Sequence, residues 1–527
     1  MFAKRLPRTF TFISIVLLLF FRFAASAAPE SSNQLAAKTD QITIDFWTLV
    51  QQKIPTGVCS REGTGAIRCT GPVRLSGLTN LNINGDHEVL SFLDASPGHG
   101  GLTFDNAENV DLHGLEIGWE AGGVNDPMPT IGPPIQSLGR VLACSQGATG
   151  GSLELDRRID GVQPIKSVSI WDDARGWPWY GDAPPAPESS INVIGHFQNG
   201  HSECFSQLRG LIGRRVLVRH ITSNHAFVCN ACNYVALENV RVTSAPGMAF
   251  VFQRGGRHLV LRNNSISPKC SPSCRSAEPS VVGDGAHFGD VGGDVLIEGN
   301  DFGWQGDDSV NVAGNLLRAE REPGTSKFIV IAGHRARTAG LSSGATVSLF
   351  DVALKPLGHA HLTSSVGDAG EISFSDADLP AGIVDLVFEL TDHIPVGLIV
   401  RNNHFHDHRA RGILIGASNA VVENNVIERV TMNGILIEAD TDHWYEGPAP
   451  TNVAVRHNKI SEANRFPTPG YPSVISAGVD LDPSYHGAAN ASISQLNVEG
   501  NETHNIHSNP DRTVNVGSGA ACERCDH

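Results

Sequence analysis

A short run of alternating apolar residues, followed by an asparagine and another apolar residue, recurs along this chain. Alternation with a period of two places every second side chain on one face of a β-strand, and no helical period accompanies it. The pattern therefore predicts many short strands. The clear copies are HLVLRNNSI (258–266), DVLIEGNDF (294–302), GLIVRNNHF (397–405), NAVVENNVI (419–427), NVAVRHNKI (452–460) and SQLNVEGNETHNI (494–506), and the weaker ones are NVDLHGLEI (109–117), RVLVRHITS (215–223) and YVALENVRV (234–242).

The spacing of these copies indicates a solenoid. The clearest intervals run from Asn239 to Asn263 and from Asn403 to Asn425. Both fall within the range of roughly 20–50 residues that is typical of solenoid repeats, so we predict an all-β fold, a right-handed parallel β-helix. Asparagine tolerates left-handed backbone geometry at a corner between strands, and stacked asparagines can hydrogen-bond from coil to coil. Longer intervals, such as the one from Asn425 to Asn458, imply loops inserted at corners.

Two segments interrupt the repeat. Residues from about 119 to 208 are rich in glycine and proline, which predicts a loop-rich insertion. Residues 318–395 contain KFIVIAGH, ATVSLFDVAL, GEISFSD and DLVFELTD, which predict a small antiparallel β-barrel or sandwich inserted between coils. The expected organisation is therefore a first β-helical part (28–317), the inserted domain (318–395), a second β-helical part (396–505) and a C-terminal tail (506–527).

The N-terminal segment (1–27) has the character of a secretory signal peptide. A positive start precedes a mostly apolar run, and a small-residue cleavage site follows it. These features are Lys4, Arg5 and Arg8, then Phe10 to Phe21, then Ala25-Ser26-Ala27. We expect a secreted, periplasmic or otherwise extracytoplasmic protein, free of the membrane once the signal is cleaved, with an uncleaved anchor as the alternative. No later stretch reaches the roughly 18 apolar residues that a membrane span needs.

The ten cysteines are consistent with an oxidising compartment. Four local pairs are predicted as disulfides, which leaves Cys144 and Cys204. The alternative for one pair is zinc, because Cys229 and Cys232 lie near His220 and His225, although no second Cys-x-x-Cys follows at the spacing of a zinc module. The four pairs are Cys59 with Cys69, Cys229 with Cys232, Cys270 with Cys274, and Cys522 with Cys525.

The formal charge of −16 limits the classes of partner. No run of lysine or arginine could follow the phosphates of a nucleic acid or the carboxylates of a polyuronate. A neutral or weakly charged substrate suits this chain better, and nucleic acid is not expected as a partner.

The strongest candidates for chemistry are three aspartates. Asp284 stands alone, and Asp307 is followed at once by Asp308. The interval from Asp284 to Asp307 is about one coil, so the three carboxyl groups are expected to converge and to supply the acid and base that glycoside hydrolysis needs. Crowded carboxylates cannot all ionise easily, so one should keep its proton. Adjacent residues in a strand face opposite ways, and Gly306 permits the bend that would turn both aspartates outward. Calcium binding or a turn cap is the alternative.

Six further residues are candidate substrate contacts. His287 and Asn311 flank the aspartates and could instead be structural corner residues. Arg411 follows on a later copy, in HRARGILIG (408–416), and its alternative is a surface salt bridge. Glu438, Trp444 and Glu446 lie in GILIEADTDHWYEG (434–447). Flat Trp and Tyr faces stack on the apolar face of sugars and charged groups hold hydroxyls, so this cluster favours a sugar subsite. No metal or cofactor is expected.

Four segments between about 240 and 460 combine these candidate residues with the coil repeat. They are SAPGMAFVFQ (244–253), GDGAHFGDVGGDVLIEGNDFGWQGDDSVNV (283–312), RNNHFHDHRARGILIG (401–416) and ILIEADTDHWYEGPAPTNVAVRHNKI (435–460). In these segments and their order the chain resembles glycoside hydrolase family 110, the inverting exo-α-galactosidases that include α-1,3-galactosidases. The polygalacturonase family also uses a lone Asp and an Asp pair, but its Gly-His-Gly and Arg-x-Lys motifs do not follow the Asp pair here.

The resemblance implies the activity in outline. Asp284, Asp307 and Asp308 become the catalytic acids of an inverting reaction with no covalent intermediate and no cofactor. Arg411, Glu438, Trp444 and Glu446 would line a galactose site. The leading hypothesis is therefore an exported glycosidase that removes α-linked galactose from an oligosaccharide or glycan. The alternatives are a β-helical polysaccharide hydrolase or lyase of pectinase type and a non-catalytic carbohydrate-binding solenoid.

Overall fold

The computed structural model describes most of the chain from residue 41 onwards. The signal segment, Cys204 and the Cys270–Cys274 pair lie outside the described residues, and so does the side chain of Cys144. In the described part no helix is long and apolar enough to cross a membrane. The residues described are 41–525 except 64, 87, 121–133, 145–150, 156–161, 173–176, 179–190, 199–200, 203–211, 221–223, 270–278, 332–333, 335–337, 339–340, 365–369, 376–381, 442, 466–467, 469–470, 482–492, 507–513 and 517–519.

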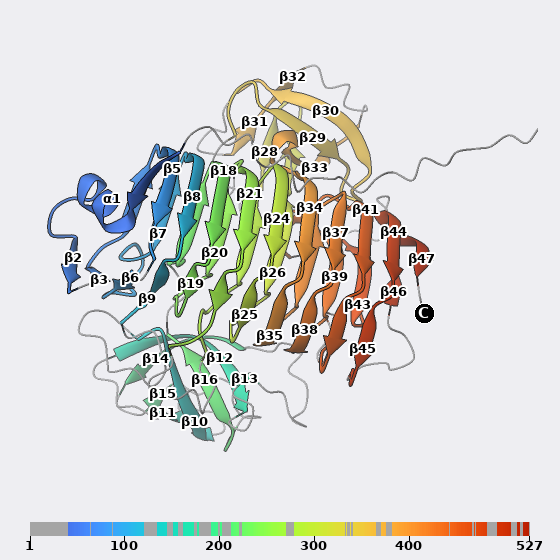
Figure 1. The fold of residues 1–527 in the computed structure, drawn as a ribbon. Coiled ribbons are helices and arrows are strands. Elements are labelled where there is room, and N and C mark those ends of the chain that lie inside the picture. Colours follow the sequence, from blue (N-terminus) through green and yellow to red (C-terminus); the bar gives the residue numbers. More distant parts are fainter. Residues whose placement is uncertain are drawn as a thin grey trace, which may run out of the picture. The chain divides into compact units, whose positions relative to one another are not determined.

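Three long sheets wind around one apolar core, and nearly all their strand pairs are parallel (Figure 1). Sheet A contains β1 (Ile42–Asp45), β5 (Thr79–Asn84), β8 (Glu108–His113), β18 (Asn233–Glu238), β21 (Arg257–Arg262), β24 (Gly293–Glu298), β34 (Pro395–Arg401), β37 (Ala420–Glu423), β41 (Thr451–Arg456), β44 (Ile493–Glu499) and β47 (Ala520–Cys525). Sheet B contains β2 (Cys59–Glu62), β3 (Ala66–Cys69), β6 (Val89–Phe92), β9 (Glu116–Trp119), β19 (Arg241–Val242), β22 (Ser265–Ile266), β25 (Asp301–Gly303), β35 (His404–His408), β38 (Val426–Val430), β42 (Lys459–Ser461) and β45 (Glu502–His504). Sheet C contains β4 (Val73–Ser76), β7 (Leu102–Asp105), β17 (Phe227–Asn230), β20 (Phe250–Gln253), β23 (Ala286–Gly289), β26 (Val310–Asn315), β36 (Ile413–Gly416), β39 (Ile435–Asp440), β43 (Ile475–Asp480) and β46 (Val514–Val516).

The predicted parallel β-helix is confirmed, and its register follows the sequence repeat. Ala286 of β23 pairs with Val310 of β26, so these two residues mark the length of one coil. Val310 pairs in turn with Ile413, and Ile413 with Ile435. All of these side chains are fully buried and stack along the inside of the helix, because alternate residues of a strand face the same side.

A continuous ladder of asparagines, buried except for the partly exposed Asn501 at its end, joins the coils. Each side chain before the last donates through Nδ2 to the Oδ1 of the next asparagine, at 2.9–3.1 Å, and to a backbone carbonyl of the coil before it. Each Oδ1 after the first also accepts the backbone N–H of the preceding ladder residue. Every polar atom of these amides is thereby satisfied away from water, which makes the ladder favourable rather than costly. Its members are Asn264, Asn300, Asn403, Asn425, Asn458 and Asn501.

The residue before each ladder asparagine makes the corner. It adopts a left-handed backbone, with φ between 53° and 68°. Asparagine and glycine tolerate this region best, which explains why Asn-Asn and Gly-Asn recur in the sequence. The two asparagines of a pair therefore have different tasks, since the first turns the chain and the second joins the coils. The corner residues are Asn263, Gly299, Asn402, Asn424, His457 and Gly500.

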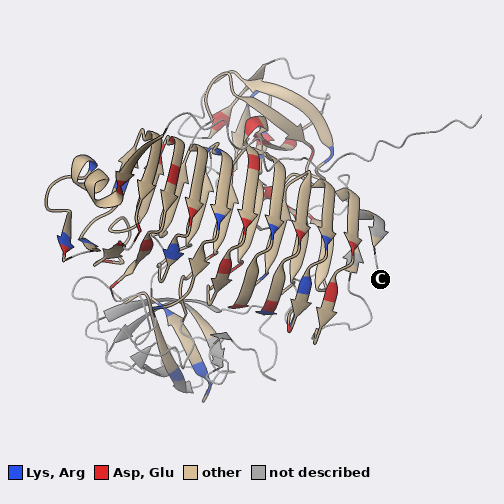
Figure 2. Cartoon of the chain, viewed as in Figure 1, with Lys and Arg blue, Asp and Glu red and all other residues tan. Residues whose placement is uncertain are grey.

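Charges of opposite sign alternate along sheet A at the last residue of successive strands (Figure 2). The Arg262 guanidinium lies between Glu238, at 2.9 Å, and Glu298, at 3.2 Å. Glu298 also contacts Arg401 at 2.7 Å. Each such pair is worth only about 0.2–1 kcal/mol, but a slipped register would separate every Arg of the row from its Glu partners. The row is Glu238, Arg262, Glu298, Arg401, Glu423, Arg456 and Glu499.

The inserted domain between β26 and β34 is an antiparallel sheet with its own apolar core, as the apolar segments predicted. Its strand order is β31-β28-β27-β33-β29-β30-β32. The short 3-10 helix η4 (Thr391–His393) returns the chain to the β-helix. The strands are β27 (Leu317–Arg321), β28 (Phe328–Val330), β29 (Thr346–Phe350), β30 (Pro356–Leu362), β31 (Glu371–Ile372), β32 (Phe374–Ser375) and β33 (Asp385–Leu390).

The first interruption differs from the loop-rich insertion that its composition predicted. It forms a second antiparallel sheet, and this sheet extends to Arg219. The segment 215–223 was therefore wrongly assigned as a copy of the coil repeat, since its strand pairs with β10 and β12 rather than with a coil. The strands are β10 (Gln136–Cys144), β11 (Gly151–Leu155), β12 (Val162–Asp172), β13 (Trp177–Pro178), β14 (Ile191–Gln198), β15 (His201–Ser202) and β16 (Arg215–Arg219).

The sequence repeat gave no sign of helix α1 (Phe46–Lys53). Asp45 caps its first turn by accepting the Thr48 N–H at 2.8 Å, and the helix buries Phe46, Leu49 and Val50 against the core. An eight-residue helix shows too few turns for its period to stand out, so its stability comes from this packing.

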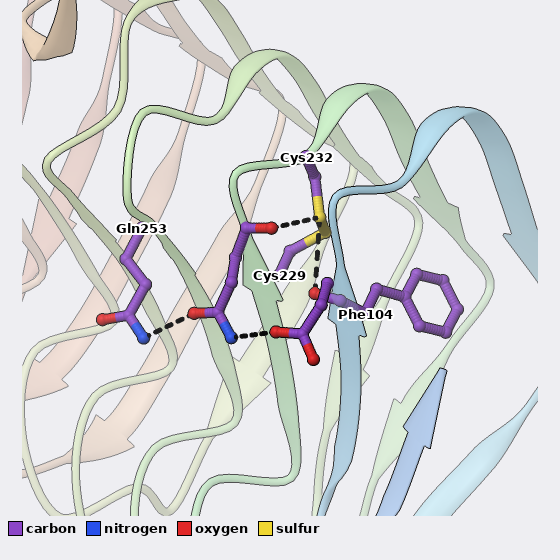
Figure 3. The surroundings of a disulfide bond; sticks show 6 residues. Phe104, Cys229, Cys232 and Gln253 are labelled. Atoms are coloured by element: carbon purple, nitrogen blue, oxygen red, sulfur yellow. Dashed lines mark hydrogen bonds between the residues drawn. A yellow bond between two sulfur atoms is a disulfide. The ribbon is translucent and has the colours of Figure 1, made fainter. Parts of the chain in front are cut away.

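Three of the four predicted local disulfides lie in the described residues, and all three are formed: Cys59–Cys69, Cys229–Cys232 and Cys522–Cys525. The zinc alternative for Cys229 and Cys232 is thus wrong. Figure 3 shows this disulfide beside Phe104 and next to a short polar ladder. In that ladder Gln253 donates to Asn230 and Asn230 donates to Asp105, each at 2.8 Å.

Replacing a ladder residue should destabilise the whole β-helix. Asn403→Ala removes two donated hydrogen bonds, to Ile297 O and Asn425 Oδ1, and leaves the buried N–H groups of Asn300 without their acceptor. We expect the free energy of unfolding to fall by on the order of 3 kcal/mol, because buried polar groups are left without hydrogen-bond partners. Denaturant unfolding of Asn403→Ala and of the partly exposed strand variant Asn497→Ala gives the comparison. Equal stability of the two variants would contradict a structural role for the ladder.

Candidate active site

Three successive coils place a charged residue at the same point, just before a strand of sheet C. Asp284 lies two residues before β23, Asp308 two residues before β26 and Arg411 two residues before β36. Backbone bonds tie these points together, because Gly285 N donates to Asp308 O at 2.8 Å and Ser309 N donates to Arg411 O at 3.1 Å. Coil stacking, rather than local sequence, brings these side chains into contact.

The aspartate pair occupies a bend between β25 and β26 rather than a strand. A Cβ at Gly306 would lie 2.1 Å from the Val282 carbonyl oxygen, so only glycine fits where the bend crosses the previous coil. The bend separates the two aspartates: Asp307 is 41% exposed and Asp308 is 4% exposed. Even so, one oxygen from each of Asp284, Asp307 and Asp308, here called the acid trio, lies within 4.8 Å of the others.

Two arginines from the coil after the inserted domain neutralise part of this charge. Arg411 donates its backbone N–H to Asp308 Oδ1 at 2.7 Å and its Nη1 to Asp308 Oδ2 at 3.0 Å. Arg409 Nη1 lies 3.1 Å from Asp307 Oδ2 and donates to the Gly306 carbonyl at 3.0 Å. Charge-assisted bonds of this kind are strong when buried and fix the orientation of the carboxylates. With two of three carboxylates already paired, the acid trio is a poor calcium site.

Burial raises the affinity of the acid trio for protons. Desolvation raises the pKa of Asp308 to about 7, Arg411 opposes this shift, and the charges of Asp307 and Asp284 add to it. The pKa of Asp284 is also raised by burial, against a hydrogen bond of 2.9 Å from His287. Burial lowers the pKa of His287, but Asp284 and the surrounding acids outweigh it and the net shift is upward. The cluster therefore holds protons near neutral pH while it keeps negative charge.

A neutral histidine supports the bend from beneath. Nε2 of His408 lies 2.7 Å from Ser309 Oγ, and its Nδ1 lies 3.1 Å from the Asp307 carbonyl oxygen. Burial lowers the pKa of His408 to about 4, so the ring stays uncharged. Gln305 donates to the same Ser309 hydroxyl at 2.6 Å. Sequence reasoning missed this support, since HRAR gives no sign of which side chain points inward.

Asn311, Glu438 and Glu446 lie close to the acid trio or to its partners His287 and Arg411, whereas Trp444 is hydrogen-bonded within its own segment. Asn311 neighbours His287 in the register of sheet C, and its Nδ2 donates to Glu446 Oε1 at 3.2 Å. Burial raises the pKa of Glu446, whereas His287 and Asn311 lower it. Trp444 is 60% exposed on the loop after β39, where Asp440 accepts its backbone N–H at 2.8 Å.

Tyr445 differs from the sugar-stacking aromatic that the sequence suggested. Its left-handed backbone, with φ 55°, turns the side chain away from solvent. The ring packs against His334 of the inserted domain, with centroids 4.1 Å apart. In Trp444-Tyr445-Glu446 the first residue is therefore exposed, the second is structural, and the third reaches Asn311.

A loop between β42 and β43 covers the side of the site next to β39. Asn433 anchors it by donating to the carbonyl oxygens of Tyr471, at 2.9 Å, and Ser473, at 2.6 Å. Thr468 accepts from Arg411 Nε at 3.1 Å. The Tyr471 hydroxyl bonds Glu438, which burial keeps at a raised pKa of about 7. No motif in the sequence marked Thr468 or Tyr471, because their contacts depend on how the loop folds back.

Comparison with known proteins links this chain to sugar-cleaving enzymes. Residues 391–521 match the family model "Right handed beta helix region". The chain is 29% identical over 216 residues to α-1,3-galactosidase A of Bacteroides fragilis, covering 38% of this chain and 35% of that protein. It is 27% identical over 256 residues to α-1,3-galactosidase B of Bacteroides thetaiotaomicron, covering 47% and 40%. The matched regions thus span less than half the length of these relatives.

Among solved structures, the chain matches the family 28 exopolygalacturonase of Yersinia enterocolitica. It is 11% identical and covers 87% of this chain and 62% of its own, with a TM-score of 0.38. A similarity this low does not bear on function.

The buried Glu438 makes stability depend on pH. Burial raises its folded pKa to about 7, with Asp440 adding to the effect and Arg411 opposing it. A carboxyl with a raised pKa costs stability as pH rises from its unfolded value of about 4.5 towards 7. Between pH 5 and 8 the free energy of unfolding of the wild type should fall by up to roughly 3 kcal/mol more than that of Glu438→Gln. Thermal melts across this range measure the difference. Exposed Glu499→Gln is the control, and parallel curves for all three proteins would contradict the expectation.

Proposed function

We propose that this chain is an exported glycoside hydrolase, an exo-acting α-galactosidase that releases terminal α-linked galactose from oligosaccharides or glycans. The observation that carries the proposal is the acid trio, in which three carboxyl groups converge and burial raises the pKa of Asp284 and of Asp308, the latter to about 7. The choice of galactose rests on the resemblance to the α-1,3-galactosidases. The proposal of export rests on the predicted signal peptide.

The acid trio has the properties that glycoside hydrolysis requires. One carboxylic acid must protonate the departing glycosidic oxygen while a carboxylate activates water. Shared protons among close carboxyl groups allow both states to coexist. Asp307 is the most exposed member and is placed to meet a substrate first. Asp308 is held on both oxygens by Arg411, which favours its anionic form and suits it to accept a proton.

The stereochemistry of the proposed reaction is inverting, and this element rests on the family resemblance alone. Inverting enzymes generally separate their acid and base by about 6.5–9.5 Å, and retaining enzymes by about 5–5.5 Å. The oxygens of the acid trio lie closer together than either range. The configuration of the first-formed sugar, followed by NMR, is therefore a separate test that leaves the hydrolase proposal standing either way.

The surroundings suit a neutral sugar. Arg409 and Arg411 are paired with Asp307 and Asp308, so neither is spare to hold a uronate, as a lyase of pectinase type would require. Glu446, Glu438 and Asn311 provide acceptors and donors for hydroxyl groups, and exposed Trp444 offers an apolar face. The net charge of −16 also disfavours a polyanionic substrate.

Removing a carboxylate of the acid trio should abolish turnover without unfolding the protein. We expect Asp307→Asn and Asp308→Asn each to lower kcat by about 10³-fold or more on α-galactosides, because proton transfer is lost. Galactose release measures activity, and circular dichroism confirms folding. Asp105→Asn, on the same sheet several coils away, is the matched control. Wild-type activity in both trio variants would show that the acid trio is not the catalytic centre, whereas glycan binding without turnover by the wild type would favour a binding solenoid.

Trp444 should contribute binding rather than chemistry. Its removal in Trp444→Ala is expected to raise KM about 10-fold while kcat changes little, since stacking on a sugar is worth on the order of 1–2 kcal/mol. Tyr234→Ala removes an exposed aromatic side chain from sheet A and should leave both constants unchanged. An unaltered KM in Trp444→Ala would contradict stacking of the sugar on Trp444.

A further inference from the structure

A second cluster of titratable side chains lies on sheet B, and the proposed reaction does not use it. Asp301 of β25 pairs in register with His404 of β35, and Gly303 pairs with His406. Residues 404 and 406 face the same side of their strand, two positions apart. We call Asp301, His404 and His406 the histidine cluster.

The three ligand atoms of this cluster are spaced as metal ligands are. Asp301 Oδ1 lies 2.9 Å from His404 Nδ1 and 3.3 Å from His406 Nε2. One atom from each residue lies within 4.8 Å of the others. Ligands about 2.0–2.2 Å from a zinc-like ion are separated by roughly 3.3–3.6 Å in tetrahedral geometry. An ion bound to all three atoms therefore needs only small side-chain movements.

The nitrogen of each ring that faces away from this point is held by a second carboxylate. His404 Nε2 lies 3.1 Å from Glu428 Oε1, and His406 Nδ1 lies 2.8 Å from Asp407 Oδ2. Ligating histidines in metal sites almost always have such a partner, which fixes the ring and raises its basicity. Arg429 in turn bonds both Asp407 and Glu428. A simple surface ion pair does not require a second carboxylate on the far nitrogen of both rings.

Neighbouring residues hold the rings in place. His404 and His406 stack with centroids 4.3 Å apart, and Trp304 meets His406 edge-on at 4.8 Å. A Cβ at Gly303 would lie 2.5 Å from His406 Cε1, so glycine leaves the room that the ring occupies. His406 is 8% exposed, whereas His404 and Asp301 are 42% and 60% exposed, so the cluster is rigid on one side and open to solvent on the other.

We propose that the histidine cluster binds one divalent transition-metal ion through Asp301 Oδ1, His404 Nδ1 and His406 Nε2, with solvent completing the coordination. Two imidazoles and one carboxylate select zinc, nickel or copper over calcium or magnesium, which prefer oxygen ligands. The ion would join β25 to β35, the two strands of sheet B on either side of the inserted domain. Its role is structural, because it ties together the coils that carry Asp307, Asp308, Arg409 and Arg411.

Metal binding to the untagged, full chain tests this proposal. After dialysis against Zn²⁺ and then against metal-free buffer, elemental analysis should find about one zinc per chain, with a higher melting temperature than the EDTA-treated protein. Co²⁺ bound in place of zinc should show visible d–d absorption bands. Failure to retain zinc, with no shift in melting temperature, would overturn the proposal whatever the enzymatic activity.

Variants locate the ion. His406→Ala, or the more exposed His404→Ala if the first folds poorly, should abolish stoichiometric zinc and the cobalt bands. Asp407→Asn should weaken zinc binding about 10–100-fold through the loss of the outer carboxylate. His258→Ala removes a histidine that has only a distant carboxylate, at 3.5 Å, and should bind zinc normally. Asp308→Asn should also bind normally, and loss of zinc there instead would assign the ion to the acid trio and sink the proposal.

Discussion

The asparagine ladder fixes how each coil lies on the next, and the chemistry of this protein depends on that register. Asn300 and Asn403 are hydrogen-bonded neighbours although the whole inserted domain separates them in the sequence. The same offset separates Asp308 from Arg411 and Asp301 from His404. An error of one residue in the ladder would shift one coil along the next and would separate the side chains of each of these pairs. The inserted domain can thus be large without disturbing the site.

Desolvation gives the acid trio its chemical character. Stacking identical positions of successive coils places charges close together and away from water, and this costs free energy unless they are paired. The arginines offset part of that cost, and the remaining part is expressed as raised proton affinity at Asp284 and Asp308. Elsewhere the same stacking principle gives alternating Glu and Arg along sheet A, where each charge has an opposite neighbour. Stacked coils can therefore hold a row of alternating charges that pair with one another, as on sheet A, or a cluster of like charges with raised proton affinity, as in the acid trio.

The sequence predicted the features that a local pattern marks, and it missed those that depend on how a single segment folds back. The period and the Asn pairs are local signals repeated many times, so the parallel β-helix and the convergence of Asp284 with Asp307 and Asp308 could be inferred. The sheet from Gln136 to Arg219 was missed because its strands are separated by glycine- and proline-rich segments, and RVLVR alternates as a coil strand does. Thr468 and Tyr471 could not be found, since nothing local reports that their loop turns back onto Arg411 and Glu438.

The inserted domain also takes part in forming the wall of the site. Its His334 packs on Tyr445, and its Arg318 hydrogen-bonds the same tyrosine. Leu316, at the root of the insertion, donates its N–H to the Tyr445 carbonyl at 2.8 Å, while β40 (Glu446–Gly447) pairs with the end of β26. Because Tyr445 is held on one side, its neighbours Trp444 and Glu446 are held in opposite directions, one towards solvent and one towards Asn311. The insertion therefore positions two of the proposed sugar contacts without supplying either of them, and changes within it can alter substrate binding while the acid trio stays intact.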